Sequence, residues 1–133
     1  MAIFYLSVKM ISRGKGKSAV AASAYRSGEK ITSDYDGITH DYTRKRGIAE
    51  TLIMLPDNAP IEFYNRSTLW NAVEKIEKAK NSQLAREIEV AIPNELSISD
   101  QYQLVKEFCK MNFVDKGMIA DICFHNKKDG NPH

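Results

Sequence analysis

Three separated segments of the chain alternate between apolar and polar residues, and this period of two constrains the fold more than any other feature. The first segment, residues 3–11, places four apolar side chains on one face: Phe4, Leu6, Val8 and Met10. Residues 84–92 and 118–125 alternate in the same way. A period of two is typical of half-buried strands. We therefore expect three strands, the two later ones with an apolar face packed against helices.

Three other segments have the start signals and the apolar spacing of helices. Ser18 is placed to cap an alanine-rich helix over residues 19–27, which Gly28 would end. Asn65 or Ser67 can cap a second helix, running to about residue 79, with a predicted buried stripe of Leu69, Ala72, Val73 and Ile76. Ser97 and Asp100 flank the start of a third, with a predicted buried stripe of Leu104, Val105, Phe108 and Met111.

The remaining segments complete an α+β pattern. Residues 31–48 contain an Asp-Gly turn and indicate a hairpin or a long ordered loop, and residues 50–55 indicate a further strand. We expect an antiparallel sheet with helices on one side, in a single domain over residues 1–133. The turn before His133 should lead into another strand, so we expect the chain to be a C-terminally truncated fragment of a longer protein.

Positive charge is concentrated in one part of the chain. Residues 9–46 carry nine Lys and Arg against four Asp and Glu, whereas the rest carries ten against thirteen. A basic segment suits a polyanionic partner, because Lys and Arg release counterions from phosphates. A solvated basic surface is the alternative.

The composition also bears on location and on the two cysteines. The chain has no apolar run of about 20 residues and no continuous apolar core of a signal peptide, so we expect a cytoplasmic location without membrane insertion. Cys109 and Cys123 lack the paired spacing of a zinc site or a redox couple. We expect both to be buried thiols.

Ionisable side chains lie on the polar faces of the two later strands. If these strands are neighbours, Glu87, Glu89, Asp121 and His125 share one open surface. An ordinary solvated sheet face would show the same pattern. A turn separates His125 from His133 and can bring their imidazoles together, in a donor set suited to a divalent metal. Surface histidines in a loop are the alternative.

Tyr25 lies near the end of the first predicted helix. Arg26 is its neighbour, and the preceding loop carries Lys15 and Lys17. A tyrosine nucleophile needs such positive surroundings to receive a phosphate. By spacing alone, a tyrosine that only fills a core or surface position would look the same.

Together these segments resemble the N-terminal domain of the MobA/MobL mobilisation relaxases, a branch of the HUH endonucleases. The resemblance covers essentially the whole chain. It rests on six segments in the same order: MAIFYLSVKMISRGKGKSAVAASAYRSGEK at the start, HDYTRK at 40–45, LWNAVE at 69–74, QLAREIEVAIP at 83–93, FVDKGMIAD at 113–121, and the pair His125 and His133. It implies a sheet of about five antiparallel strands with a histidine cluster on its open face and helices behind.

The resemblance implies DNA nicking at a plasmid origin of transfer. Tyr25 would attack the scissile phosphate, leaving a 5′-phosphotyrosyl intermediate and a free 3′-hydroxyl. His125 and His133 correspond to two of three ligands of a divalent metal ion, Mg2+ or Mn2+. Glu87 or Glu89, with Glu89 favoured, would orient a ligand histidine or the tyrosine. Contacts to DNA would come from the basic residues Lys9, Arg13, Lys15, Lys17, Arg26, Arg44, Lys45 and Arg46.

The sequence departs from the family pattern at its last residue. The third metal-ligand histidine of the family lies two residues after the second, beyond His133. We therefore expect weak metal binding and impaired nicking by this fragment. The implied partners are single-stranded and hairpin DNA at the origin, accessory transfer proteins and a coupling protein, in the cytoplasm of a plasmid-bearing bacterium. A non-catalytic origin-binding module and a rolling-circle replication initiator are the alternatives.

Overall fold

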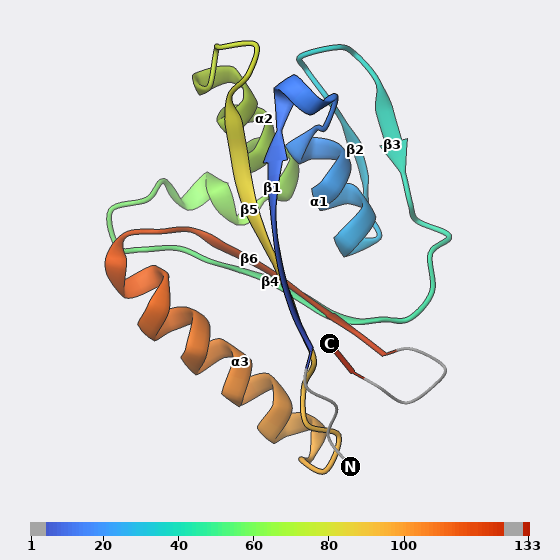
Figure 1. Ribbon diagram of the computed structural model, residues 1–133, viewed down its shortest axis with the longest axis vertical. Coiled ribbons are helices and arrows are strands. Elements are labelled where there is room, and N and C mark those ends of the chain that lie inside the picture. Colours follow the sequence, from blue (N-terminus) through green and yellow to red (C-terminus); the bar gives the residue numbers. More distant parts are fainter. Residues whose placement is uncertain (1–4, 127–131) are drawn as a thin grey trace.

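A computed structural model describes residues 5–126 and 132–133 of the chain. Its strands are β1 Leu6–Ser12, β2 Lys30–Thr32, β3 Thr39–Asp41, β4 Ile48–Met54, β5 Gln83–Val90 and β6 Ala120–His125. Its α-helices are α1 Ala19–Ser27, α2 Arg66–Ile76 and α3 Ile98–Asn112 (Figure 1). Three short 3-10 helices are η1 Arg13–Lys15, η2 Ile61–Tyr64 and η3 Val114–Lys116. The expected α+β class is confirmed.

The strands pair antiparallel, two by two, as β1 with β5, β2 with β3, and β4 with β6. The last two residues connect the first pair to the third. The amide of Ile92 donates to the Pro132 carbonyl at 2.9 Å, and His125 and His133 exchange two backbone hydrogen bonds of 2.7 and 3.0 Å. In the described parts of the chain, the expected five-stranded sheet takes the form of separate antiparallel pairs.

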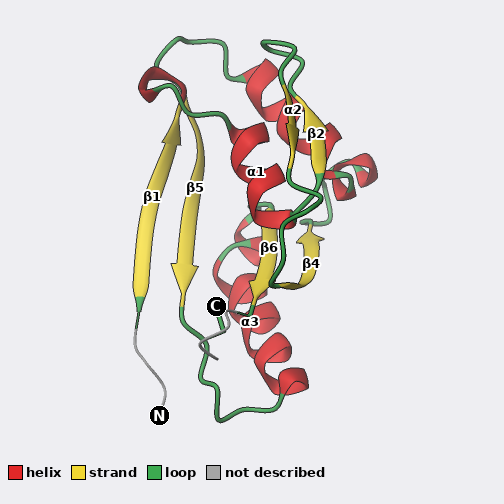
Figure 2. Cartoon of the chain, turned by 90° about the vertical axis from the view of Figure 1, so that its right-hand side faces the viewer, coloured by secondary structure: helices red, strands yellow, loops and turns green. Residues whose placement is uncertain are grey.

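Helices cover both faces of the β4–β6 pair, rather than one face as expected. On one face, Ile122 and Phe124 pack against Tyr102 and Val105 of α3. On the other face, Asp121 is bonded to side chains of α1 and α2. The β1–β5 ribbon stands to one side of the helices (Figure 2). The β4–β6 pair is therefore the layer against which all three helices are placed.

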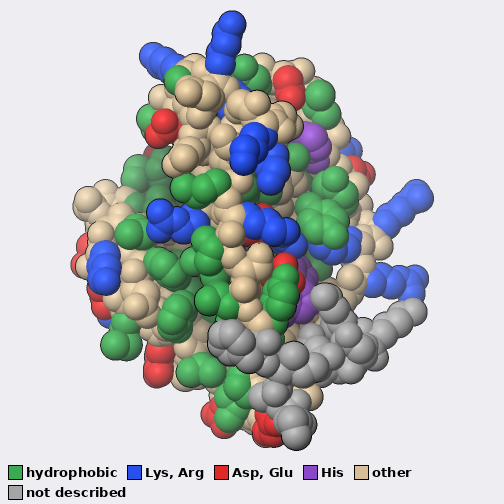
Figure 3. Space-filling model, viewed as in Figure 1, with side chains coloured by type: hydrophobic (Ala, Val, Ile, Leu, Met, Phe, Trp, Pro, Cys, Tyr) green, Lys and Arg blue, Asp and Glu red, His purple; other side chains and the backbone are tan. Residues whose placement is uncertain are grey.

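Much of the apolar face of the β1–β5 ribbon is turned to solvent, which corrects the prediction of a core-facing stripe except at Leu84 and Ile92, which are buried. Leu6 and Val8 are 54% and 57% exposed, and Ile88 and Val90 on β5 are also exposed. Figure 3 shows hydrophobic side chains at the surface in this region. The reason is that α1 approaches the opposite, polar face of the ribbon, where Arg26 pairs with Glu87.

The predicted stripes of α2 and α3 are also partly wrong. Leu69 of α2 is buried, but Ile76 is 70% exposed because the helix ends there, before residue 79. On α3 the residues Leu104, Phe108 and Met111 are exposed. Val105 does face the core as predicted, and the other residues on this side of α3 are Tyr102 and Cys109. The predicted stripe and the stripe that faces the core are adjacent on the helix and have nearly the same residue spacing. Periodicity alone could therefore not distinguish the two.

Helix α1 agrees with its prediction and lies at the centre of the molecule. The Ser18 side chain accepts from the amide of Ala21 at 3.1 Å, and Gly28 ends the helix with a φ of 70°. Val20 and Ala24 have no exposed surface. Among the described residues, no helix is long and apolar enough to cross a membrane.

Gly28 supports a prediction about the end of α1. A Cβ at Gly28 would meet Cδ1 of Ile48, whereas one at Gly37, with a φ of 73°, would meet nothing within 4 Å. We expect Gly37→Ala to lower the free energy of unfolding by about 1 kcal/mol for the left-handed backbone alone. Gly28→Ala should cost about 1–3 kcal/mol more, because Ile48 must also move. Urea unfolding of both variants measures the difference, and equal losses would contradict this account.

Candidate functional site

Tyr25 lies in the last turn of α1 with its side chain 45% exposed. Its ring packs edge-on against Tyr42, with 5.3 Å between ring centroids. The Lys45 Nζ lies 3.5 Å from the centroid of the Tyr25 ring and donates a 2.8 Å hydrogen bond to the Tyr25 carbonyl oxygen. The turn after β3 therefore holds the tyrosine from two sides while nearly half of it stays accessible.

Arg26 links the end of α1 to the two strands that carry the other predicted site residues. Its guanidinium pairs with the carboxylate of Glu87 on β5, and its carbonyl oxygen lies 2.8 Å from Nε2 of His125 on β6. A carbonyl oxygen only accepts hydrogen bonds, so this contact assigns the proton of the neutral imidazole to Nε2. The lone pair of Nδ1 is then the one suited to a metal ion.

The structure brings together the two histidines that the sequence singled out. The ring centroids of His125 and His133 are 5.1 Å apart, and Oε1 of Glu89 lies 4.0 Å from Nε2 of His133. The two imidazoles fit a divalent metal ion by donor type. Within residues 5–126 and 132–133, however, no three His, Cys, Asp or Glu side chains are placed to hold a metal ion.

The electrostatics of this region favour a neutral histidine beside two cations. Burial lowers the pKa of His125, the nearby charges of Lys45, His133 and Arg26 add to the effect, and the hydrogen bond to the Arg26 carbonyl opposes it. Burial also lowers the pKa of Lys45, together with the charge of Arg26 and against the influence of Cys123. A bound anion would reduce the repulsion between the two neighbouring cations, Lys45 and Arg26.

Asp121 lies beneath the site rather than on the open surface expected for it. Its side chain is 9% exposed. Oδ1 accepts a 2.8 Å hydrogen bond from Nε of Arg66, and Oδ2 accepts from Oγ of Ser23 at 3.0 Å and from Nε1 of Trp70 at 2.8 Å. This carboxylate joins β6 to α1 and α2, and Ser23 is two residues from Tyr25.

Arg66 is as buried as its partner. Its Nη1 donates to Glu29 at 3.0 Å and to Thr51 at 3.2 Å. Burial disfavours the charge of Arg66, but Asp121 and the other partners outweigh it and raise the pKa of Arg66 above its usual value. Arg66 is therefore charged at neutral pH.

The two cysteines are half-buried and free of disulfides, rather than fully buried as expected. Burial and the negative charge of Asp121 raise the pKa of Cys123 to about 12, against the opposing charge of Arg66. Burial also raises the pKa of Cys109. Both are protonated thiols at neutral pH and are poor nucleophiles in that form.

The basic residues predicted to contact DNA differ in how available they are. Five are exposed: Lys9, Lys15, Lys17, Arg44 and Arg46. Lys45 donates a hydrogen bond to the Tyr25 carbonyl, and Arg26 forms an ion pair with Glu87. Arg13 donates from its guanidinium to backbone carbonyls at the C-terminal end of α2. Its charge therefore supports the helix end in addition to any contact with a ligand.

Arg66, Trp70 and Glu74 were not among the residues that the sequence patterns singled out. A spacing of four residues puts all three on one side of α2. Glu74 is 5% exposed, and its Oε1 accepts from Oγ of Ser18 and from the amide of Ala19, both at 2.8 Å. Two charged residues and a tryptophan on one helix side were the available signal, because charges facing a core are kept only when they are paired.

Comparison with known proteins finds one matching family and relatives named as transfer or mobilization proteins. Residues 17–133 match the model of the MobA/MobL family. The whole chain is 38% identical to the conjugal transfer protein TraA of Rhizobium radiobacter, and 94% of it is 38% identical to the mobilization protein MobL of Acidithiobacillus ferridurans. The chain spans 13% and 32% of the lengths of these proteins.

The fold is also similar to a solved structure described as the molecular basis of vancomycin resistance transfer in Staphylococcus aureus. The match covers 98% of the chain and 66% of the solved one, with a TM-score of 0.91 and 37% sequence identity. At this level of identity the likeness covers both the fold and the sequence.

The buried ion pair leads to a prediction about stability. Asp121→Ala leaves Arg66 buried without its main partner, so we expect a loss of about 3–5 kcal/mol in the free energy of unfolding. Asp115→Ala is the matched control, because Asp115 pairs with Lys110 at the surface, where the side chains are 48% and 62% exposed. That change should cost less than about 1 kcal/mol. If urea unfolding gave similar losses of unfolding free energy for the two variants, the buried pair would contribute no more to stability than the surface pair.

Proposed function

Because the chain belongs to the MobA/MobL family of conjugative relaxases, we propose that it nicks one DNA strand at an origin of transfer and so initiates conjugative transfer or mobilisation. The observation that carries this proposal is the position of Arg26. One residue after Tyr25, its side chain pairs with Glu87 and its carbonyl contacts His125. Tyrosine, imidazole and carboxylate, distant in sequence, are thereby brought to one region.

The proposed reaction is a transesterification. The phenol oxygen of Tyr25 attacks the scissile phosphorus, a bond from this oxygen to phosphorus forms, and the bond from phosphorus to the 3′-oxygen breaks. The phenol gives up its proton, and the leaving 3′-oxygen takes one up to become a hydroxyl. The number of phosphodiester bonds is unchanged, so the reverse reaction can rejoin the strand without a nucleotide cofactor.

A divalent metal ion, Mg2+ or Mn2+, belongs to the proposal. His125 and His133 would hold it, and it would supply positive charge to the phosphate. His125 is suited to this role because its pKa is lowered and the neutral ring is favoured. Glu89, 4.0 Å from His133, is placed to orient that imidazole, which supports Glu89 over Glu87 in this role. Glu87 instead holds Arg26.

Lys45 has a role in this proposal beyond general attraction of DNA. Its Nζ lies over the ring of Tyr25 and is anchored to the carbonyl of the same residue. A phosphate that approaches the phenol oxygen therefore approaches this ammonium group as well. The position is costly before DNA binds, since burial and Arg26 lower the pKa of Lys45. A phosphate oxygen would offset that cost and would gain charge in the transition state.

The partners in this proposal are single-stranded and hairpin DNA at the origin of transfer, with accessory transfer proteins and a coupling protein in the bacterial cytoplasm. The exposed cations Lys15, Lys17, Arg44 and Arg46 would contact the DNA backbone. A non-catalytic origin-binding module would use the same cations without forming a covalent product, so the two functions differ in the chemistry of Tyr25.

The first test follows the covalent product. With Mn2+ and single-stranded oligonucleotides that tile an origin of transfer, we expect a slowly accumulating protein–DNA adduct on denaturing gels. Tyr25→Phe should abolish the adduct and leave DNA affinity nearly unchanged, because only the phenol oxygen is removed. Tyr64→Phe, at an exposed tyrosine of η2, is the control and should form the adduct normally. DNA binding without any adduct would favour the binding module over the nickase.

A second test isolates Lys45. At saturating DNA, Lys45→Ala should slow adduct formation about 100-fold, comparable to the loss of one preorganised contact to a transition-state oxygen. Lys45→Arg keeps the charge and should recover part of the rate. Lys30→Ala removes an exposed lysine of β2 as a control. A full rate in Lys45→Ala, measured by single-turnover kinetics, would remove Lys45 from the reaction.

A further inference from the structure

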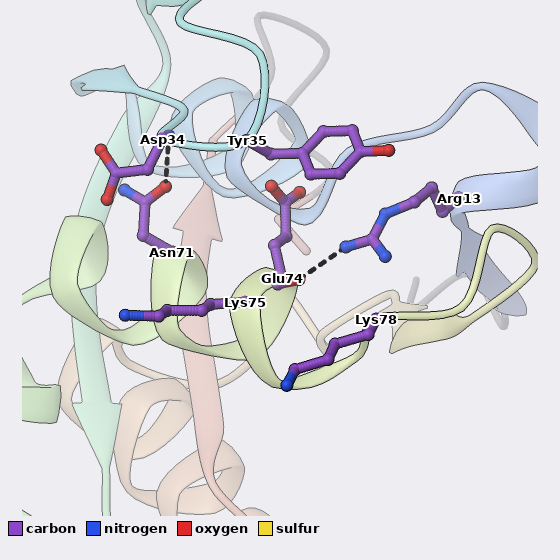
Figure 4. A pocket seen from close by; sticks show the side chains of 7 residues that line it. All are labelled: Arg13, Asp34, Tyr35, Asn71, Glu74, Lys75 and Lys78. Atoms are coloured by element: carbon purple, nitrogen blue, oxygen red, sulfur yellow. Dashed lines mark hydrogen bonds between the residues drawn. The ribbon is translucent and has the colours of Figure 1, made fainter.

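A cavity of about 520 Å³ lies between α2 and the turn that follows β2. Figure 4 shows Tyr35 and Arg13 across the cavity from Lys75 of α2 and from Lys78, which lies two residues after the end of this helix. The volume falls within the range of small-molecule sites, roughly 300–1,000 Å³. None of the residues proposed for catalysis lines it, so it needs a separate explanation.

The aromatic wall of the cavity is preorganised. The guanidinium carbon of Arg13 lies 4.5 Å from the centroid of the Tyr35 ring. The same guanidinium is bonded to the carbonyl oxygens of Glu74, at 2.7 Å, of Ala79, at 3.1 Å, and of Glu77. Tyr35 nevertheless remains 65% exposed. An exposed aromatic ring that a fixed cation supports from one side is a ready surface for stacking.

Asn71 fixes the turn that carries Tyr35. Its Oδ1 accepts from the amide of Asp34 at 2.8 Å, and its Nδ2 donates to the carbonyl of Thr32 at 3.0 Å. These bonds attach the turn to α2 on both sides of Ser33. The backbone at Tyr35 is therefore held at a defined separation from α2, and a ligand between them need not order the turn.

The charge available in the cavity is positive. Lys75 and Lys78 are exposed, and neither forms an ion pair with another described residue. Glu74 also lines the cavity, but its carboxylate is turned inward, where the start of α1 and Ser33 donate to it. The helix N-terminus thereby offsets the charge of Glu74. Asp34 is the remaining acidic residue of the lining, and its one negative charge is smaller than the combined positive charge of Lys75 and Lys78.

We propose that this cavity binds one nucleotide of single-stranded DNA, with the base on Tyr35 and the phosphate at Lys75 and Lys78. An aromatic platform beside cations is the chemistry by which proteins hold single strands without reading their sequence. This inference rests on the proposed function, because a protein that nicks an origin of transfer encounters single-stranded DNA there. Glu74 ties the cavity to the start of α1, and Tyr25 lies at the other end of this helix, about 10 Å along the axis. The nucleotide bound here is therefore not the one that is cleaved.

The first measurement is fluorescence anisotropy with labelled oligothymidylate of about 12 nucleotides, a length within the usual site range of single-strand binders. The double variant Lys75→Ala/Lys78→Ala should bind about tenfold more weakly, and the slope of log affinity against log salt should fall by about 0.7, because the two lysines together contact one phosphate. Tyr35→Ala should also bind about tenfold more weakly, but with the salt slope unchanged, because it removes stacking and no charge.

The matched control is Lys106→Ala/Lys110→Ala, which removes two lysines of α3. It should change the affinity less than about twofold, because distant exposed charges are screened. Equal losses in the two double variants would show that only net charge matters and would overturn the proposal.

The second measurement locates the base. Ultraviolet cross-linking of the same oligonucleotide with 5-bromodeoxyuridine should give, by mass spectrometry, a modified peptide that contains Tyr35, and Tyr35→Ala should lose it. Cross-links found only elsewhere would overturn the assignment. A thymidine monophosphate that competes as tightly as the oligonucleotide would make this a free-nucleotide site and would overturn the DNA assignment.

The two proposals can fail separately. If wild type forms the Tyr25 adduct while the cavity variants bind DNA normally, the nickase stands and the cavity proposal is wrong. If no adduct forms but binding depends on Tyr35, Lys75 and Lys78, the cavity proposal stands without the nickase.

Discussion

A carboxylate and a guanidinium meet beneath the candidate site with almost no exposure to water, and the positions of the surrounding elements follow from how that pair is satisfied. Asp121 accepts from Arg66, Trp70 and Ser23, so one side chain of β6 holds both α1 and α2. Burying two charges is unfavourable unless each finds partners. Moving α1 or α2 away would leave one of them unpaired, and this restricts the place that Tyr25 can occupy.

Helix α1 connects the two ligand sites that we propose. Its start is capped by Ser18 and bonded to the buried carboxylate of Glu74, which belongs to the cavity at Tyr35. Its end carries Tyr25 and stops at Gly28, whose backbone is left-handed. A short helix is rigid, so the distance between the two ends is set by its length. A DNA strand that reached both would have its backbone placed relative to the tyrosine by contacts remote from the reaction.

The errors of sequence analysis have a common physical origin. The ribbon of β1 and β5 has one apolar and one polar face, and the ordinary rule places the apolar face inward. Here the helix approaches the polar face, because Arg26 pairs with Glu87, and Leu6 and Val8 are left in solvent. On α3 the choice between two adjacent stripes was likewise decided by packing against Ile122 and Phe124. Periodicity describes the faces of an element and does not say what lies against each face.

Local signals were sufficient for most of the elements. Alternation and capping predicted the strands and α1, because strand period, Ser18 and Gly28 act through neighbours in the chain. The family resemblance singled out Tyr25, Glu89, His125 and His133, and the structure brings the last three close together. Only the tertiary structure decided that Asp121 is buried, that Arg13 supports the end of α2, and that Lys45 lies over Tyr25. These contacts join residues that are 20 to 98 positions apart. No local pattern encodes them, because their energy depends on burial and partners that exist only once the chain has folded.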